Sequence, residues 1–298
     1  MMMTDDVAHA TYRLRMDRER GAMELAMQAV EFAAALIEAA PERDVRQVVH
    51  ALATGRPSMA AIANAVALFA LPLLTQGQGR VANVVRHEAT LRIARWQTDN
   101  EALRLNATRH IPPVILAYSN SSTTRAILLE LAHAGRIEQV IVPEGRPIDD
   151  GKRLAITLAA AGIPVTVITE AQMGAWVPQV GAVLVGADTI MPDGTLVNHM
   201  GTATLALLAE AHHIPMISVA HSLKIAPYHR PEDTSEENDP AEVWRDPPSG
   251  VTLSNPAFDQ TPSTRVTLIT ERGVLTDSLC AEVVAVHREA WIACGIGA

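Results

Sequence analysis

The feature that most constrains the fold of this chain is a change in its hydrophobic pattern near residue 110. Before that point apolar residues recur at helical spacing, and no run typical of a strand occurs. After it, helical stretches alternate with short apolar runs rich in β-branched residues, at 114–118, 139–142, 164–169, 182–186, 216–220 and 266–270. Such runs separated by helices are typical of a parallel sheet covered on both faces. We therefore predict an α/β protein, with a helical N-terminal domain over 1–108 and a Rossmann-like parallel-sheet domain over 109–298.

The first 108 residues predict a set of amphipathic helices. After Gly21, Leu25, Ala29, Ala33 and Ile37 fall on one stripe at helical spacing. Further helices are expected over residues 42–54, 57–74 and 81–107.

Composition argues against several classes of function. The formal net charge is −9 and aromatic residues make up 3% of the chain, whereas nucleic-acid binding needs a basic surface and rings for base stacking. Two cysteines, Cys280 and Cys294, are too few for a disulfide framework or a cysteine-rich zinc site. No segment is typical of a signal peptide or a bilayer span. We therefore expect a soluble cytoplasmic protein with no nucleic-acid or membrane partner.

The sequence lacks the common motifs for cofactors and metals. No GxGxxG follows the first strand, and no GxxxxGK[ST] occurs. His212 and His213 are adjacent rather than four apart, and there is no HExxH. We expect neither a cofactor nor a metal site.

A hydroxyl-rich turn, SNSSTT at 119–124, follows the first predicted strand and begins a helix. Ligands of open α/β sheets bind beyond the carboxyl ends of the strands. There Ser121 and Ser122, with the free N–H groups of the helix, would suit a phosphate. The alternative is ordinary N-capping by either serine.

Charged residues follow three other strands, and each alone has an ordinary structural explanation. Glu144 and Arg146 follow 139–142, Asp188 follows 182–186, and Lys224 follows 216–220. Asp188 could be an acid or base, or it could be a turn residue, and a lone lysine is usually on the surface. Together with the hydroxyls they predict a pocket for a phosphorylated, neutral-bodied ligand such as a sugar phosphate.

An acidic, proline-bearing stretch lies between Pro227 and Gly250. We interpret it as a solvated loop, with the role of a lid left open.

Five segments resemble one protein family. They are RERGAMELA, TGRPSMAAIANAV, VPEGRPIDDGKRLAITLAAAGIPVTVIT, VGADTIMPDGTLVNHMGTATLALLAEAHHIPMISVAHSLKI and LSNPAFDQTPSTRVTLITERGVL. The family unites ribose-1,5-bisphosphate isomerase and methylthioribose-1-phosphate isomerase with the alpha, beta and delta subunits of initiation factor 2B. The N-terminal motifs are most similar to those of ribose-1,5-bisphosphate isomerases. The resemblance covers nearly the whole chain in order, and it implies the same two domains, usually as a homodimer.

The resemblance also implies roles for matched positions. Asp188 matches the catalytic aspartate of the enzymes, and Ser119 stands where they have a catalytic cysteine. The implied positions for binding the sugar and its phosphates are Arg20, Gly21, Ala22, Arg56, Ser121, Ser122, Asn198, His199 and Lys224.

Three departures from the pattern bear on activity. Ser119 replaces the cysteine, His199 follows Asn198 where the isomerases have lysine, and Asp150 replaces a glutamine. Opening the ring of an aldose 1-phosphate needs an acid, for which Asp188 is suited, and a hydrogen must then move from C2 to C1. A serine hydroxyl cannot relay that proton without an adjacent base, and only His199 or Asp150 is available.

Two functions therefore follow from the sequence. The first is an aldose-ketose isomerase acting on a pentose 1-phosphate such as ribose 1,5-bisphosphate, with a related isomerase for a ligand lacking one phosphate as a variant. The alternative is a non-catalytic protein that binds a sugar phosphate or nucleotide and signals to a partner, like the alpha subunit of initiation factor 2B.

Overall fold

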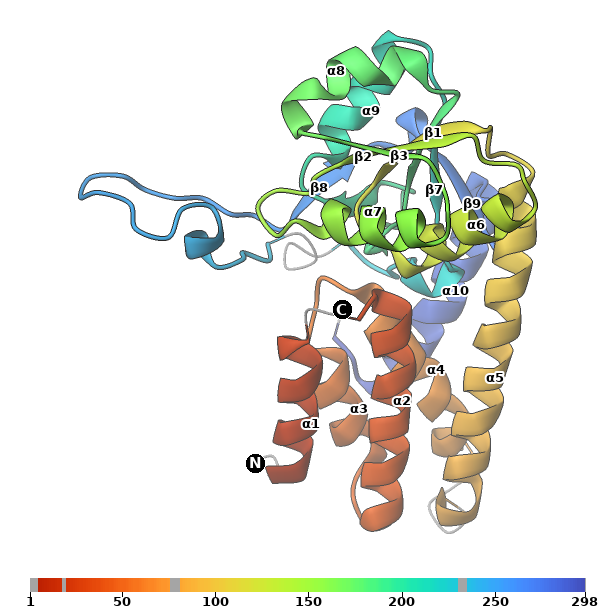
Figure 1. Cartoon of the computed structure of the whole chain (residues 1–298). Helices are drawn as coiled ribbons and strands as arrows, with labels where there is room; N and C mark the ends of the chain where they lie inside the picture. Colours follow the sequence, from red (N-terminus) through yellow and green to blue (C-terminus); the bar gives the residue numbers. More distant parts are fainter. Residues whose placement is uncertain (1–4, 18–19, 76–80, 230–234, 298) are drawn as a thin grey trace.

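The computed structural model describes residues 5–17, 20–75, 81–229 and 235–297. A helical unit and an α/β unit are stacked on each other, and two long helices extend from one unit to the other (Figure 1). These are α5 (Val81–Thr108) and α10 (Asp277–Cys294). In this part of the chain no helix combines the length and apolar character that crossing a membrane requires.

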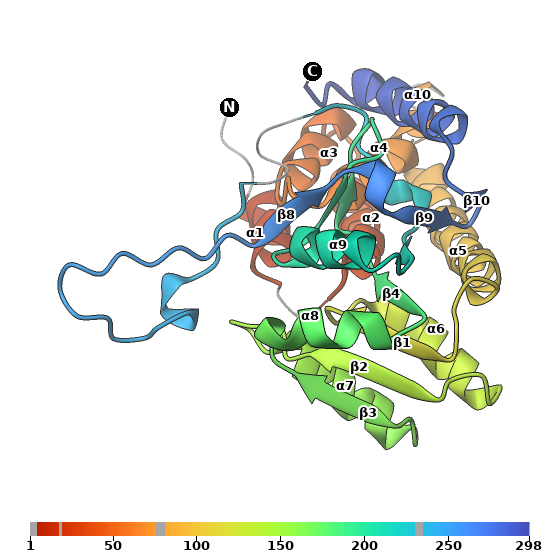
Figure 2. The ribbon, with the colours of Figure 1, turned by 90° about the horizontal axis from the view of Figure 1, so that it is seen from above.

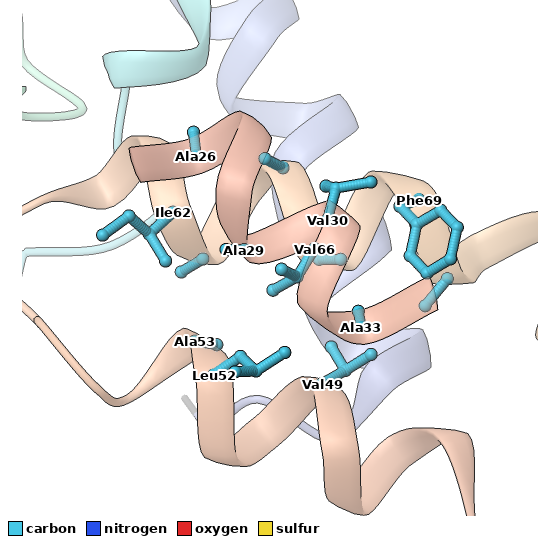
Figure 3. Close-up of a cluster of buried hydrophobic side chains, with 14 of the residues drawn as sticks. Ala26, Ala29, Val30, Ala33, Val49, Leu52, Ala53, Ile62, Val66 and Phe69 are labelled. Carbon is cyan, nitrogen blue, oxygen red and sulfur yellow. The ribbon is translucent and has the colours of Figure 1, made fainter. Parts of the chain in front are cut away.

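The helical unit is built on small side chains. Its helices are α1 (Asp5–Met16), α2 (Ala22–Ala39), α3 (Val45–Ala53) and α4 (Ala60–Thr75). Ala26, Ala29 and Ala33 of α2 face Leu52 of α3 and Val66 of α4 in one buried cluster (Figure 3). Alanines bring helix axes close together, which explains how a chain with so few aromatics fills this core. The end of α10 joins the same cluster through Trp291 and Cys294.

The α/β unit contains a seven-stranded sheet in the order β10-β9-β7-β4-β1-β2-β3, parallel except for β10. The strands are β1 (Val114–Tyr118), β2 (Gln139–Pro143), β3 (Val165–Ile168), β4 (Ala182–Val185), β7 (Met216–Val219), β9 (Thr267–Thr270) and β10 (Gly273–Val274). The chain winds outward from β1 in one direction through β2 and β3, and in the other through β4, β7 and β9. The strand order therefore reverses between β1 and β4, where α/β proteins open a crevice.

Helices cover both faces of this sheet (Figures 1 and 2). Helices α6 (Ser122–His133), α7 (Asp150–Ala160) and the end of α5 pack on one face. Helices α8 (Met173–Trp176), α9 (Thr202–Ala211) and the start of α10 pack on the other. Successive residues of β1 point to opposite faces, so Ile115 lies in one cluster and Leu116 in the other. The predicted α/β fold is confirmed.

A second, three-stranded antiparallel sheet was not predicted. It consists of β5 (Thr189–Ile190), β6 (Leu196–His199) and β8 (Phe258–Thr261). These strands are two to four residues long and partly polar, so they have no hydrophobic period to detect. This sheet matters because β6 carries Asn198 and His199.

Candidate functional site

A cavity of about 400 Å³ opens between the carboxyl ends of the strands and the helical unit. Ligand sites are typically roughly 300–1,000 Å³. Every position that the resemblance marked lines this cavity: Arg20, Gly21, Ala22, Arg56, Ser119, Ser121, Ser122, Asp188, Asn198, His199 and Lys224. The structure thus brings together residues from the first helices and from four strand ends.

Two residues that we expected at this rim, Glu144 and Arg146, do not line the cavity. Glu144 forms an ion pair with Lys152 (3.1 Å), and Arg146 donates from Nη2 to the Val243 carbonyl (3.2 Å). Neither lines the cavity, so the expectation that Arg146 supplies its arginine is wrong. The cavity takes its guanidinium groups from Arg20, Arg56 and Arg153 instead.

Ser119 lies where the strand order of the sheet reverses, and its backbone conformation is unusual. It directly follows β1, it is 6% exposed, and its φ of 69° is in the left-handed region that non-glycine residues rarely adopt. Strained backbone of this kind concentrates at functional sites. Tyr118 pairs with Val185 of the neighbouring β4, so Ser119 and Asp188 lie on adjacent strand ends.

The start of α6 is closely packed against two glycines. Ser121 caps the helix by accepting the Thr124 N–H (3.4 Å), as the capping interpretation of this turn expects. A Cβ at Gly186 would lie 2.7 Å from Ser121 Oγ, and one at Gly21 would lie 3.1 Å from Ser122 Oγ. The absence of side chains at these glycines lets the helix N-terminus face the cavity.

Asp188 and Lys224 form the charged floor of the site. Both are buried, and Lys224 Nζ donates to the Ala187 carbonyl (2.5 Å). Burial lowers the pKa of Lys224, and the Asp188 carboxylate opposes that effect. An ammonium held in this way is a ready partner for an anionic ligand.

Arg56 is already engaged by a carboxylate. Its Nη1 donates to the Asp17 carbonyl (2.7 Å), and its Nη2 pairs with Glu236 (3.2 Å), which also accepts a hydrogen bond from Ser58. Arg56 Nε is buried and has no hydrogen-bond partner among the described residues. A buried guanidinium with a spare N–H fits a second acceptor such as a phosphate oxygen.

Arg20 is held at the mouth of the cavity and is about half exposed. Its Nη1 donates to Asp17 (2.9 Å) and to Gln28 (3.1 Å). It lies just ahead of Gly21 and Ala22, which begin α2. These three residues form the part of the lining that the helical unit contributes along one edge.

Asn198 and His199 enter from the small sheet. Asn198 donates to Thr202 Oγ1 (3.0 Å), while His199 packs edge-on against Phe258 with 6.0 Å between ring centroids. His199 Nδ1 lies 3.9 Å from Asp150 Oδ2, at the start of α7. Asp150 is itself buried and lines the cavity.

The segment 235–256 leaves the body as an extended arm between β7 and β8 (Figures 1 and 2). Its base lines the cavity through Glu236, Asn238 and Glu242, which the sequence analysis did not single out. Asn255 fixes this base, since its side chain donates to the Asp239 carbonyl (2.8 Å) and to Glu242 (3.0 Å). Most of this segment is exposed, as the interpretation of 227–250 as a solvated loop expects, although Glu236 and Asn238 are partly buried in the cavity lining. Residues 230–234 lie outside the described residues. The acidity of this stretch was the sequence feature that could have pointed to these cavity-lining residues.

Among the described residues no cluster of three His, Cys, Asp or Glu side chains is placed to hold a metal ion.

The fold and the cavity define a class: a Rossmann-like unit that, together with N-terminal helices, encloses a cavity of the size typical of ligand sites. The chain belongs to the Initiation factor 2 subunit family, whose model matches residues 18–277. The resemblance drawn from the sequence is thus confirmed.

Relatives in this family carry different names. The 5-deoxyribose 1-phosphate isomerase of Moorella thermoacetica is 35% identical over 243 residues, covering 78% of this chain and 66% of that protein. The ribose 1,5-bisphosphate isomerase of Methanocaldococcus jannaschii is 33% identical over 166 residues, covering 54% of each. The crystal structure of translation initiation factor eIF-2B from Pyrococcus horikoshii superposes with a TM-score of 0.75 at 27% identity, covering 92% of this chain and 98% of that one. The matches span about half to two thirds of the isomerases' length.

Proposed function

We propose that this protein is an aldose-ketose isomerase that converts a pentose 1-phosphate, such as ribose 1,5-bisphosphate, to its ketose. The observation that supports the proposal is that Ser119 and Asp188 follow two adjacent strands and line one cavity together with Lys224 and Arg56. The sugar-phosphate isomerases among the relatives support this class of reaction.

The site offers separate groups for the two ends of such a substrate. Lys224 and the start of α6 suit one phosphate, and the spare N–H of Arg56 suits a second anionic group that would compete with Glu236. Asp188 is the acid that protonates the ring oxygen as the C1–O bond breaks, and it later takes back a proton. We further propose a homodimer, which light scattering on the purified protein tests.

The test is turnover of ribose 1,5-bisphosphate followed by NMR, with the appearance of a ketone carbon as the readout. Asp188→Asn, which keeps the shape of the side chain, should reduce kcat by about 10²–10⁴-fold, the usual contribution of a positioned acid or base. Full activity in this variant, or no ketose from any pentose 1-phosphate, would contradict the proposal.

A second candidate is a non-catalytic sugar-phosphate or nucleotide sensor. The observation that favours it is the hydroxyl at Ser119, which is a far weaker proton relay than a thiol. A thermal-shift titration separates the two candidates. Stabilisation by pentose phosphates without any turnover would favour the sensor, and a melting temperature insensitive to all of them would contradict both.

A further inference from the structure

The backbone on either side of Ser119 is tied to two other elements. The hydroxyl of Tyr118, one residue before, donates to the Met200 carbonyl (2.6 Å), one residue after His199. The N–H of Asn120, one residue after Ser119, donates to Asp150 Oδ2 (3.1 Å). The residues on either side of Ser119 are therefore hydrogen-bonded to the turn after His199 of β6 and to Asp150 of α7, and all three residues line the same cavity.

The hydrogen bond from the Tyr118 hydroxyl does not depend on pH in the neutral range. Burial raises the pKa of the Tyr118 hydroxyl, with further increases from nearby carboxylates, so it stays protonated and remains a donor. Gly201 allows this approach, because a Cβ there would lie 2.5 Å from the tyrosine oxygen. The turn that follows His199 is thus fixed to the end of β1.

A second set of contacts fixes the turn from the other side. Asp259 accepts the N–H groups of Gly201 (2.7 Å) and Ala203 (3.0 Å) at the start of α9. Phe258 packs edge-on against the imidazole of His199. These contacts restrict how the ring can lie before any ligand enters, which favours proton transfer.

That orientation gives the two ring nitrogens different tasks. Nδ1 faces the Asp150 carboxylate, with Oδ2 at 3.9 Å, so the tautomer with its proton on Nδ1 directs that N–H toward the carboxylate. Nε2 is then left with its lone pair free. The side chain is 34% exposed, so a proton taken up there can exchange with solvent.

We propose that His199 is the base that moves the substrate proton in this site, with Asp150 as the residue that orients its ring. The proposal rests on the isomerase function above. It gives Ser119, which cannot act without an adjacent base, the smaller task of contacting the sugar.

The two steps balance as follows. Nε2 takes the C2 proton, the C2–H electron pair becomes the C1=C2 double bond, and the C1–O ring bond breaks as its oxygen receives a proton from Asp188. The enol then gives its O2 proton to Asp188 and forms C2=O, while the double-bond electrons take the imidazolium proton at C1. Both side chains return to their starting states, and the aldose 1-phosphate has become a ketose 1-phosphate.

The experiment compares three variants for kcat, KM and deuterium incorporation at C1 in ²H₂O. His199→Gln should lower kcat by about 10²–10⁴-fold with little change in KM, whereas Ser119→Ala should lose far less. Asp150→Asn, which keeps an acceptor for the Asn120 N–H, should lower kcat while KM stays unchanged. His212→Gln, on an exposed turn, is the matched control and should behave as the unaltered protein.

In the unaltered protein the ketose should carry deuterium at C1, because the imidazolium proton exchanges with solvent. Turnover or incorporation that survives in His199→Gln, or turnover without any incorporation, overturns the assignment of His199 alone. A protein that shows neither turnover nor exchange of the C2 hydrogen contradicts the assignment together with the isomerase function.

Discussion

The cavity has two walls that are held in different ways. The sheet-rim wall (Ser119, Asp188 and Lys224) follows β1, β4 and β7, whose hydrogen-bonded register fixes where each loop begins. The ion-pair wall (Arg20, Arg56 and Glu236) comes from the helical unit and the arm, and charged side chains hold it together. Strand pairing holds the residues of the first wall in place, whereas Arg56 can exchange its ion pair with Glu236 for one with a phosphate. The comparison indicates that the sheet-rim wall holds its groups in fixed positions, whereas the ion-pair wall can exchange a protein partner for a ligand.

The largest expected effect tests how rigidly the sheet-rim wall is supported. His287 of α10 is buried beneath it, with Nδ1 2.8 Å from the Ile225 carbonyl, next to Lys224. Burial lowers its pKa from 6.5 to about 4, and the titratable groups that influence it are His221 and Glu271. The unfolded chain therefore binds a proton below pH 6.5 that the folded protein does not bind until about pH 4.

Stability should fall as the pH drops through this window, by up to about 3 kcal/mol from this one histidine. Urea unfolding at pH 7 and pH 4 measures the difference. His287→Gln should lose that part of the pH dependence, while His110→Gln on an exposed turn should keep it. If the free energy of unfolding differs between pH 7 and pH 4 by the same amount in His287→Gln as in the unaltered protein, His287 does not contribute to the pH dependence.

The next effect concerns Lys224 in the sheet-rim wall. Lys224→Met should raise the Kd for a pentose phosphate roughly 10–100-fold, since hydrogen bonds to charged groups contribute about 1.5–3 kcal/mol. The free energy of unfolding at pH 7 should fall by less than the loss of the contacts to Asp188 and the Ala187 carbonyl alone would cause, because the cost of burying the ammonium, which lowers its pKa, is removed with them. That cost disappears from the unaltered protein as the pH rises toward the ordinary lysine pKa, so the unaltered protein should gain stability relative to Lys224→Met there.

Calorimetric titration and urea unfolding check both halves of this prediction. Lys152→Met is the matched control, since that lysine is on the surface of α7 and outside the cavity. Unchanged affinity in Lys224→Met together with a large loss of stability would make Lys224 a structural residue only.

The difference between the walls also explains what the sequence could predict. Ser119, Asp188 and Lys224 were predictable because the carboxyl ends of parallel strands meet at one edge, and apolar runs mark those strands. The same rule failed for Arg146, because its loop turns toward the arm and its guanidinium binds the Val243 carbonyl.

Glu236 could not be predicted by any periodic pattern. It reaches Arg56 across 180 residues of sequence, and an irregular arm with no strand or long helix of its own carries it. His199 was found through the resemblance, but its packing against Phe258 was not, because β6 and β8 are too short to leave a pattern. Contacts made by side chains of irregular segments are fixed by the folded structure alone.

The smallest effect tests the ion-pair wall. If the Glu236 carboxylate occupies Arg56 in place of a ligand anion, then Glu236→Gln, which keeps an acceptor for Arg56, should bind a pentose phosphate about 3–10-fold more tightly. The gain should shrink at high salt, because screening weakens the competing carboxylate in the unaltered protein. Asp246→Asn, an exposed carboxylate on the same arm, should leave the affinity unchanged. Weaker binding in Glu236→Gln would instead make the carboxylate a direct ligand of the sugar, and the ion-pair wall would then share in recognition as rigidly as the sheet-rim wall.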